Sequence, residues 1–293
     1  GGTAVKLGIV DEAGAVLAKA EESVSFDGYR TPILTTVLKA AQAFLAAQSV
    51  PAESLAGIGV SATGQIDSRK GIVAGTCGNL PNYIGAPIKA ELEKTFGLPV
   101  TVANDANCMT LGEVWVGGAQ GYTDVIGVTL GTGVGAGIIH NGKVYHGANG
   151  MAGEVGHTVI IKDGLPCPCG RRGCWEQYAS ATALKRMTAE ALAAHPDSIL
   201  AQVVAENDGR VSGQSAFIAA RQGDPVGQRI CEEYVSYLSC GIVNMVNVFQ
   251  PDTLAIGGGV SNEADEQLLL PVQRCVERES IPCGKNRRTR IVK

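Results

Sequence analysis

The sequence is poor in charged and aromatic residues, and these shortages exclude several classes of protein. Charged residues make up 18% and aromatic residues 5% of the 293 positions, whereas hydrophobic residues make up 45%. A chain of this composition can bury a core, which excludes intrinsic disorder. No apolar run reaches the ~20 residues that a membrane-spanning helix needs. The formal net charge of -4 provides no basic surface for nucleic acid, so we expect neither a membrane nor a nucleic-acid partner.

Two further absences concern cysteine pairing and nucleotide binding. The nine cysteines are odd in number and lie mostly in apolar stretches, which is not the pattern of a disulfide framework. This usage indicates a reducing compartment, and we expect a cytoplasmic protein. The sequence also lacks G-x-x-x-x-G-K-[ST], so a P-loop enzyme is not indicated.

The apolar pattern alternates between strands and helices, and its first part is repeated later in the chain. Residues 4–10 with 15–20, and 125–130 with 135–140, predict two similar hairpins. Helices are predicted at 31–48, 105–116 and 226–249, and further strands at 57–60, 98–103 and 253–256. The pattern predicts an α/β protein with two related lobes, in which helices flank mixed sheets. We place the smaller lobe at residues 1–104 and the larger at 105–293.

The most specific motif combines one histidine with three cysteines. It reads G-H-x9-C-x-C-G-x-x-G-C, and its candidate ligands are His157, Cys167, Cys169 and Cys174. One imidazole and three thiolates complete a tetrahedral zinc shell, and the glycines permit the tight loop. Because four protein ligands leave no position open for water, we predict a structural zinc ion that takes no part in the chemistry.

Two glutamates flank the metal motif. Glu154 precedes His157 by three residues, and Glu176 follows Cys174 by two. Folding the loop around zinc would bring both carboxylates toward one surface, where they could accept hydrogen bonds from sugar hydroxyls. A solvated surface position is the alternative interpretation of both residues.

Asn104 and Asp105 follow a predicted strand and begin a predicted helix. Ligands of α/β proteins bind outside the carboxyl ends of the strands. Asp105 could therefore take a proton from a hydroxyl that attacks a γ-phosphate. It could also cap the helix, since aspartate is a preferred N-cap residue. The two roles do not exclude each other.

Glycine turns at strand ends could bind phosphates through their backbone amides. Each taken alone could also be a plain tight turn. The candidate turns are Gly1-Gly2-Thr3, Gly131-Thr132-Gly133 and Gly257-Gly258-Gly259.

Six segments together resemble a known family. They are GGT at 1–3, VANDANC at 102–108, LGTGVGAGII at 130–139, GANGMAGEVGH at 147–157, CPCGRRGCWEQYAS at 167–180 and LAIGGGVS at 254–261. Over nearly its whole length the chain resembles the ROK family of sugar kinases and repressors. The resemblance implies the actin-like ATPase/hexokinase fold, with two ribonuclease H-like lobes that close on ATP and a sugar.

The resemblance also implies roles for individual residues. Asp105 would be the catalytic base, and sugar contacts would come from Asn104, Glu154, His157 and Glu176, with Gly64 of SATGQID nearby. One ring nitrogen of His157 could bind zinc while the other faces the sugar. ATP with Mg²⁺ would bind at the glycine turns.

The implied activity is ATP-dependent phosphorylation of a hexose, with glucose at its 6-hydroxyl favoured. Kinases for N-acetylmannosamine, N-acetylglucosamine, fructose or a β-glucoside are the alternatives, because residues 79–83 lie where related glucokinases often carry tryptophan. A non-catalytic sugar-binding regulator is the alternative of another class. Related kinases are commonly dimers or tetramers, so we expect a homo-oligomer.

The ends of the sequence depart from the family pattern. The first phosphate motif of the family normally reads Asp-x-Gly-Gly-Thr, whereas this sequence begins at Gly1. Its last residues, Arg290 to Lys293, stand where the family usually continues into a closing helix. We expect the natural chain to extend at both ends.

Overall fold

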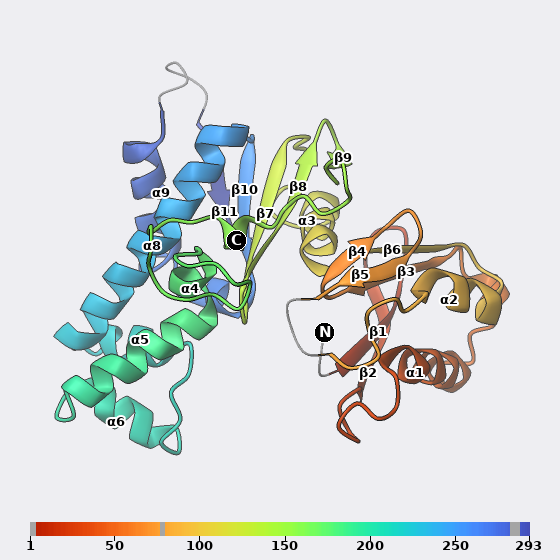
Figure 1. Cartoon of the computed structure of the whole chain (residues 1–293), viewed down its shortest axis with the longest axis horizontal. Coiled ribbons are helices and arrows are strands. Elements are labelled where there is room, and N and C mark those ends of the chain that lie inside the picture. The colour runs from red at the N-terminus through yellow and green to blue at the C-terminus, as the bar shows by residue number, and fades with distance from the viewer. Residues whose placement is uncertain (1–3, 77–79, 282–287) are drawn as a thin grey trace. The chain divides into compact units, whose positions relative to one another are not determined.

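The computed structural model describes residues 4–76, 80–281 and 288–293, and the chain divides into two compact units (Figure 1). The first unit comprises Gly1–Cys108 and His146–Ala152, and the second comprises Met109–Tyr145 and Gly153–Lys293. The chain therefore passes between the units at three points. The lobe boundary placed at residue 104 lies just before the first of them.

In the first unit, strand pairs pack with helices. Its elements are β1 (Ala4–Val10), β2 (Val16–Ser23), α1 (Ile33–Ala47), a 3-10 turn at Ala52–Ser54, β3 (Ile58–Ala62), β4 (Gln65–Asp67), β5 (Ile72–Gly75), α2 (Ile88–Phe96) and β6 (Val100–Asn104). β1 pairs with β2, and β4 with β5, in antiparallel fashion, whereas β3 runs parallel to β6. Ile66, Val73, Leu92 and Val102 lie in one buried cluster. This cluster fixes β6, which ends at the predicted catalytic residues.

The second unit is built on a five-stranded mixed sheet. Its order is β11-β10-β7-β8-β9, in which β7, β10 and β11 are mutually parallel and β8 is antiparallel to β7 and β9. After α3 (Asp105–Trp115), which begins in the first unit, the elements are β7 (Val125–Leu130), β8 (Val134–His140), β9 (Lys143–Val144), a 3-10 turn at Val155–His157, α4 (Glu176–Ala179), α5 (Ala181–Ala194), α6 (Ile199–Glu206), α7 (Ser215–Arg221), α8 (Pro225–Phe249), β10 (Thr253–Gly257), a 3-10 turn at Gly259–Asn262, α9 (Leu269–Glu279) and β11 (Arg290–Val292).

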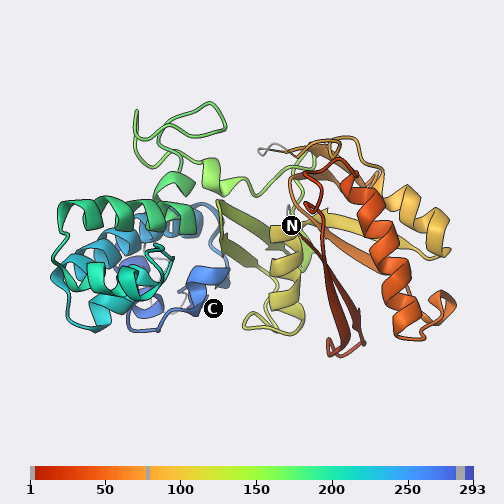
Figure 2. The same ribbon diagram turned by 90° about the horizontal axis from the view of Figure 1, so that it is seen from below.

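Helices cover both faces of this sheet (Figure 2). Along β7, Ile126 and Val128 belong to the buried cluster that includes residues of α8. The intervening Gly127 faces α3, where a Cβ atom would overlap the side chain of Thr110. Because side chains alternate between the faces of a strand, β7 is buried on both sides. This explains its nearly continuous apolar sequence.

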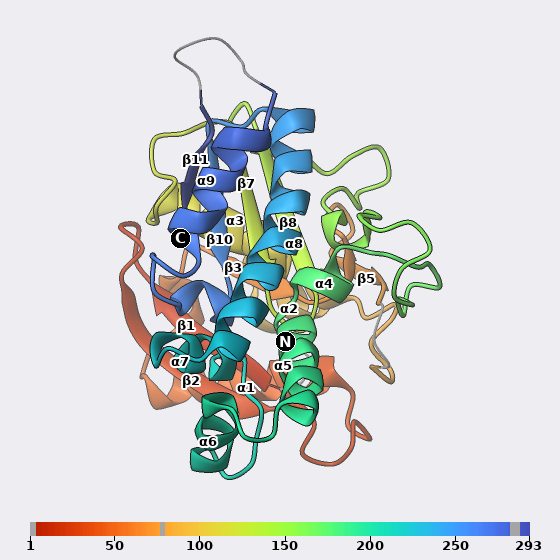
Figure 3. The ribbon, with the colours of Figure 1, turned by 90° about the vertical axis from the view of Figure 1, so that its left-hand side faces the viewer.

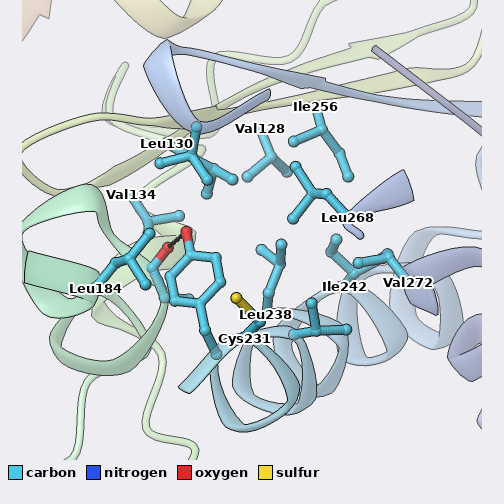
Figure 4. Close-up of a cluster of buried hydrophobic side chains, with 14 of the residues drawn as sticks. Val128, Leu130, Val134, Leu184, Cys231, Leu238, Ile242, Ile256, Leu268 and Val272 are labelled. Carbon is cyan, nitrogen blue, oxygen red and sulfur yellow. Dashed lines mark hydrogen bonds between the residues drawn. The ribbon is translucent and has the colours of Figure 1, made fainter. Parts of the chain in front are cut away.

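The main hydrophobic core lies between the sheet and α8 (Figure 4). Leu130 and Ile256 come from the sheet, and Leu238 and Ile242 come from α8, and all four are at most 1% exposed. Burial of such a side chain stabilises the fold by roughly 1.5–3 kcal/mol. This packing holds the carboxyl ends of β7 and β10, where the predicted phosphate turns begin.

One buried aspartate orders the start of two helices. Asp224 is 2% exposed, and its carboxylate accepts hydrogen bonds from the backbone N–H groups of Val226 (3.0 Å) and Leu200 (2.7 Å). The first contact caps α8, whose first residue is Pro225, and the second satisfies an N–H at the start of α6. α8 ends at Gln250, which has a left-handed conformation and precedes Pro251.

The structure confirms the predicted alternation of elements. The two hairpins are β1–β2 and β7–β8, the helices are α1, α3 and α8, and the further strands are β3, β6 and β10. The sequence reasoning did not place α4 to α7, which extend the second unit beside α8 (Figure 3). Among the described residues, every helix is too short or too polar to cross a membrane.

Candidate functional site

The four predicted metal ligands come together in the second unit. Their ligand atoms all lie within 4.8 Å of one another. Sγ of Cys169 is 3.6 Å from Sγ of Cys174, and Sγ of Cys167 is 3.7 Å from Nδ1 of His157. Zn–S bonds of about 2.3 Å at tetrahedral angles place two sulfur atoms about 3.8 Å apart. The cluster therefore has the dimensions of a tetrahedral zinc site.

Local backbone geometry explains why these cysteines converge. Within the loop, Cys167 N–H donates to the carbonyl of Arg171, and Gly170 N–H donates back to Cys167. Gly173 has a φ of 80°, and a Cβ atom there would overlap the carbonyl oxygen of Ile161. Only glycine combines this φ with so close an approach. The glycines of the motif are thus needed to fold the loop.

Two of the three sulfur atoms are buried and need a nearby cation to be ionised. Cys174 is 0% and Cys167 is 7% exposed. Burial raises the pKa of both thiols. Three thiolates beside a carboxylate would repel one another without a positive charge between them. A divalent metal ion would supply that charge, and the donor set of one imidazole and three sulfurs suits zinc.

The two predicted sugar-binding glutamates lie on opposite sides of the His157 ring. Nδ1 of His157 is 3.8 Å from Oε1 of Glu176, which also lies 3.2 Å from Sγ of Cys167. Nε2 of His157 is 3.9 Å from Oε2 of Glu154. The Glu176 side chain is 16% exposed and that of Glu154 is 48% exposed. The Nδ1 atom of the ring is therefore next to the metal ligands, and the Nε2 atom is next to an accessible carboxylate.

The first glycine turn of this unit lies against Glu176. A Cβ atom on Gly133 would be 2.5 Å from Oε2 of Glu176. The carbonyl of Gly131 accepts a hydrogen bond of 2.9 Å from Ala181 N–H, at the start of α5. The turn 131–133, which contains Thr132, is therefore attached to the segment that carries Glu176.

The second glycine turn lies beside the first. Gly257 pairs with Thr129 in the parallel ladder of β10 and β7, so both turns leave the same edge of the sheet. Gly258 has a φ of 93°, and a Cβ atom on it would overlap the backbone of Leu130. This edge holds the carboxyl ends of the parallel strands, where α/β proteins bind ligands. Gly259 completes the turn.

The first predicted turn cannot be placed in the same way. Gly2 and Thr3 lie outside the described residues, as does Asn79. Their predicted roles stay predictions.

In the first unit, Asn104 and Asp105 lie at the junction of β6 and α3. Asn104 Oδ1 accepts a hydrogen bond of 2.9 Å from Ala106 N–H, which is the pattern of a helix N-cap. Its Nδ2 donates to the carbonyl of Gly64 at 2.8 Å. Asn104 therefore caps α3 and also holds the Gly64 turn. Asp105, the N-cap suggested by the sequence, is the first helical residue; it is exposed to solvent, and its Oδ1 also accepts a hydrogen bond of 2.9 Å from Ala106 N–H.

Two nearby residues were missed by the sequence reasoning. Tyr83 is only 5% exposed, and burial together with the charge of Asp105 raises its pKa to about 12. Burial, and to a smaller degree the same charge, also raises the pKa of Cys108. Tyr83 belongs to an irregular segment without periodicity, so no sequence pattern could place it near Asp105. Cys108 lies three residues after Asp105, and helical spacing could have identified it.

Comparison with known proteins identifies the family of the chain. The model of the ROK family matches residues 1–289. A glucokinase from Halalkalibacterium halodurans is 37% identical over 283 residues, which are 96% of this chain and 84% of that protein. A β-glucoside kinase from Klebsiella pneumoniae is 34% identical over 89% of this chain and 80% of its own length.

A solved structure is similar along the whole chain. The ROK family glucokinase from Streptomyces griseus, in complex with glucose and AMPPNP, has a TM-score of 0.82 and 34% identity, and the match covers 100% of this chain and 91% of that one. This likeness confirms the predicted α/β fold of the actin-like ATPase/hexokinase class. The chain belongs to the ROK family.

Proposed function

We propose that this protein transfers the γ-phosphoryl group of MgATP to a hexose, and that glucose, at its 6-hydroxyl, is the preferred acceptor. The observation that carries the proposal is the contact between the 131–133 turn and Glu176. A phosphate-binding turn and a sugar-binding carboxylate are the two elements that a sugar kinase must bring together. The similar glucokinase of Streptomyces griseus, in complex with glucose and AMPPNP, supports this assignment.

The two glycine turns of the second unit suit the phosphates of ATP. Gly131 to Gly133 and Gly257 to Gly259 leave neighbouring strands at one sheet edge. Backbone N–H groups there can bind phosphate oxygens without a Walker lysine. Mg²⁺ would neutralise the phosphate charge as the bond to the leaving ADP breaks.

Asp105 is our candidate for the general base. It is exposed at the end of β6, and its Oδ1 shares the N–H of Ala106 with Asn104. Its second oxygen, Oδ2, would accept the proton of the attacking hydroxyl, a contribution typically worth about 10²–10⁴-fold in rate. The remaining sugar hydroxyls would be bound by Asn104, Glu154, His157 and Glu176, with the Gly64 turn beside Asn104.

We assign the zinc ion a structural role. His157, Cys167, Cys169 and Cys174 would fill the four positions of a tetrahedral shell, which would leave no position open for substrate or water. The ion would hold Nδ1 of His157 next to Glu176 and leave Nε2 for a sugar hydroxyl. Its removal should loosen the sugar-binding residues and leave Asp105 unaffected.

A substrate screen tests the proposed activity. The purified protein is incubated with MgATP and with glucose, fructose, N-acetylmannosamine, N-acetylglucosamine or a β-glucoside, and ADP release is followed in a coupled assay. We expect glucose to give the highest kcat/KM. A higher kcat/KM for another of these sugars would change the assigned substrate and leave the proposed kinase activity standing, because the same residues would bind the hydroxyls of each sugar. ADP release that no sugar stimulates would contradict the proposal.

A further inference from the structure

A pocket lies in the second unit between α5 and α8, two helices that lie side by side (Figure 3). Its volume is about 520 Å³, within the range of about 300–1,000 Å³ that is typical of small-molecule sites. Most of its lining side chains come from α5 and α8, and the others are Leu165, Tyr178 and His195. None of them is a candidate active-site residue described above.

The floor of the pocket is apolar and buried. Met187, Val226 and Ile230 line it and are between 5% and 9% exposed. Near one end the rings of Tyr178 and Tyr237 lie 5.0 Å apart at 48°. Aromatic rings of this kind pack well against the C–H face of a sugar. The floor therefore suits a ligand with a compact, partly apolar body.

The rim offers one cationic side chain that is not neutralised. Arg186 is held by Glu190 at 3.0 Å and by the carbonyl of Gln177 at 3.1 Å. Arg229, by contrast, donates to Nε2 of His195 at 3.3 Å, and within the described part of the chain no carboxylate lies within 4.0 Å of it. His195 Nε2 accepts one N–H of the exposed Arg229 guanidinium and orients it. The remaining N–H groups of Arg229 are well suited to bind a phosphate group.

The rim also carries acceptors for hydroxyl groups. Glu190 and Glu233 line the pocket with exposed carboxylates, which accept hydrogen bonds from hydroxyls. We propose that this pocket binds a small sugar phosphate, with its phosphate at Arg229, which His195 orients, and its hydroxyls toward the two glutamates. Such a site is separate from the one that performs the proposed reaction.

An occupant would contact the segment that precedes and follows Glu176. Tyr178 accepts a hydrogen bond of 2.7 Å from the backbone N–H of Leu165, in the loop of the metal ligands. Trp175 Nε1 donates to the carbonyl of Tyr237 at 2.9 Å. Both tyrosines line the pocket. Trp175 and Tyr178 are close neighbours of Glu176 in sequence, so occupancy of the pocket would be coupled to sugar binding.

Tryptophan fluorescence measures this binding directly. The chain has two tryptophans, and Trp115→Phe leaves Trp175 as the only reporter. The probe is glucose 6-phosphate, a choice that rests on the proposed function, whereas the pocket itself does not. We expect saturable quenching or enhancement, and we expect Arg229→Ala or His195→Ala to weaken it at least about tenfold. Lys185→Ala, which removes an exposed cation from α5 outside the pocket, is the matched control and should change nothing.

Glucose and inorganic phosphate, titrated separately, distinguish this pocket from the active site. Glucose 6-phosphate that binds at the active site would still change the fluorescence of Arg229→Ala. Only the part of the fluorescence change that is lost in Arg229→Ala therefore reports binding in the pocket. No signal with glucose 6-phosphate, or equal affinity in Arg229→Ala and Lys185→Ala, would overturn it. If light scattering shows that Arg229→Ala dissociates an oligomer, the pocket residues form a subunit contact, and this result would also overturn the proposal. None of these readouts depends on turnover, so failure of the kinase assay and failure of this proposal are separate results.

Discussion

Replacement of Gly241 by alanine should disturb the sugar-binding segment from a distance. Gly241 lies in the middle of α8, and a Cβ atom there would overlap the indole ring of Trp175. The ring is 0% exposed, and its Nε1 is bonded to the backbone of the same helix at Tyr237. The indole cannot move outward without breaking this bond, and Glu176 follows it directly in the chain.

Two opposing effects decide the change in stability. Alanine in a helix interior is favoured over glycine by roughly 0.5–1 kcal/mol. Overpacking of a close-packed core costs typically about 1–3 kcal/mol. Because the clash involves a rigid, fully buried ring, the second effect should win, and we expect Gly241→Ala to lose about 1–2 kcal/mol of unfolding free energy.

The same displacement should appear in the kinetics. Misplacement of a substrate-binding group by about 1 Å can lower the rate about 10²-fold, so we expect kcat/KM for glucose to fall at least about tenfold, mainly through KM. Gly112→Ala in α3 is the control, since a Cβ atom on Gly112 meets nothing within 4 Å. This control should be equally or slightly more stable, with unchanged kinetics. Urea unfolding and steady-state assays that show no difference between the two variants would refute the reasoning.

Four further predictions concern other parts of the molecule. Asp105→Asn should lower kcat by about 10²–10⁴-fold while glucose binding, measured by calorimetry, persists; near-normal turnover would remove Asp105 as the base. Chelation of the metal should lower both the melting temperature and the sugar affinity, and a metal-free protein with neither change would contradict the role of zinc. Because the folded-state pKa of Tyr83 is raised to about 12, the Tyr83 hydroxyl ionises mainly in the unfolded chain between about pH 10 and pH 12. Stability should therefore fall there by up to about 1 kcal/mol per pH unit, and Tyr83→Phe should reduce this slope in urea unfolding. Asp224→Ala should cost about 2–3 kcal/mol, since it removes N–H acceptors from α6 and α8, and an unchanged urea midpoint would argue against this double contact.

The sequence allowed prediction of those features that depend on local pattern. Periodicity identified α8, and the alternation of strands and turns identified both hairpins. The spacing of His157, Cys167, Cys169 and Cys174 identified a cluster that the structure indeed brings together. In each case the residues involved are neighbours in sequence or share one regular element.

Features that depend on packing between distant segments were not predictable from pattern. The approach of Gly133 to Glu176 joins a hairpin turn to α4 across many residues, and no spacing rule describes it. The N-cap of α3 was placed at Asp105 as one alternative because aspartate and asparagine are nearly equivalent caps. The register of β6 decides the matter, since the strand continues through Asn104. The pocket between α5 and α8 was missed because it requires the relative rotation of two helices.

The identity of the product tests the central claim most directly. Phosphorus NMR of a reaction that contains the protein, MgATP and glucose separates a sugar phosphate from inorganic phosphate and locates the phosphoryl group on the sugar. The proposed function predicts glucose 6-phosphate in amounts equal to the ADP formed. ADP accompanied only by inorganic phosphate, or no consumption of ATP with any hexose tested, would contradict it.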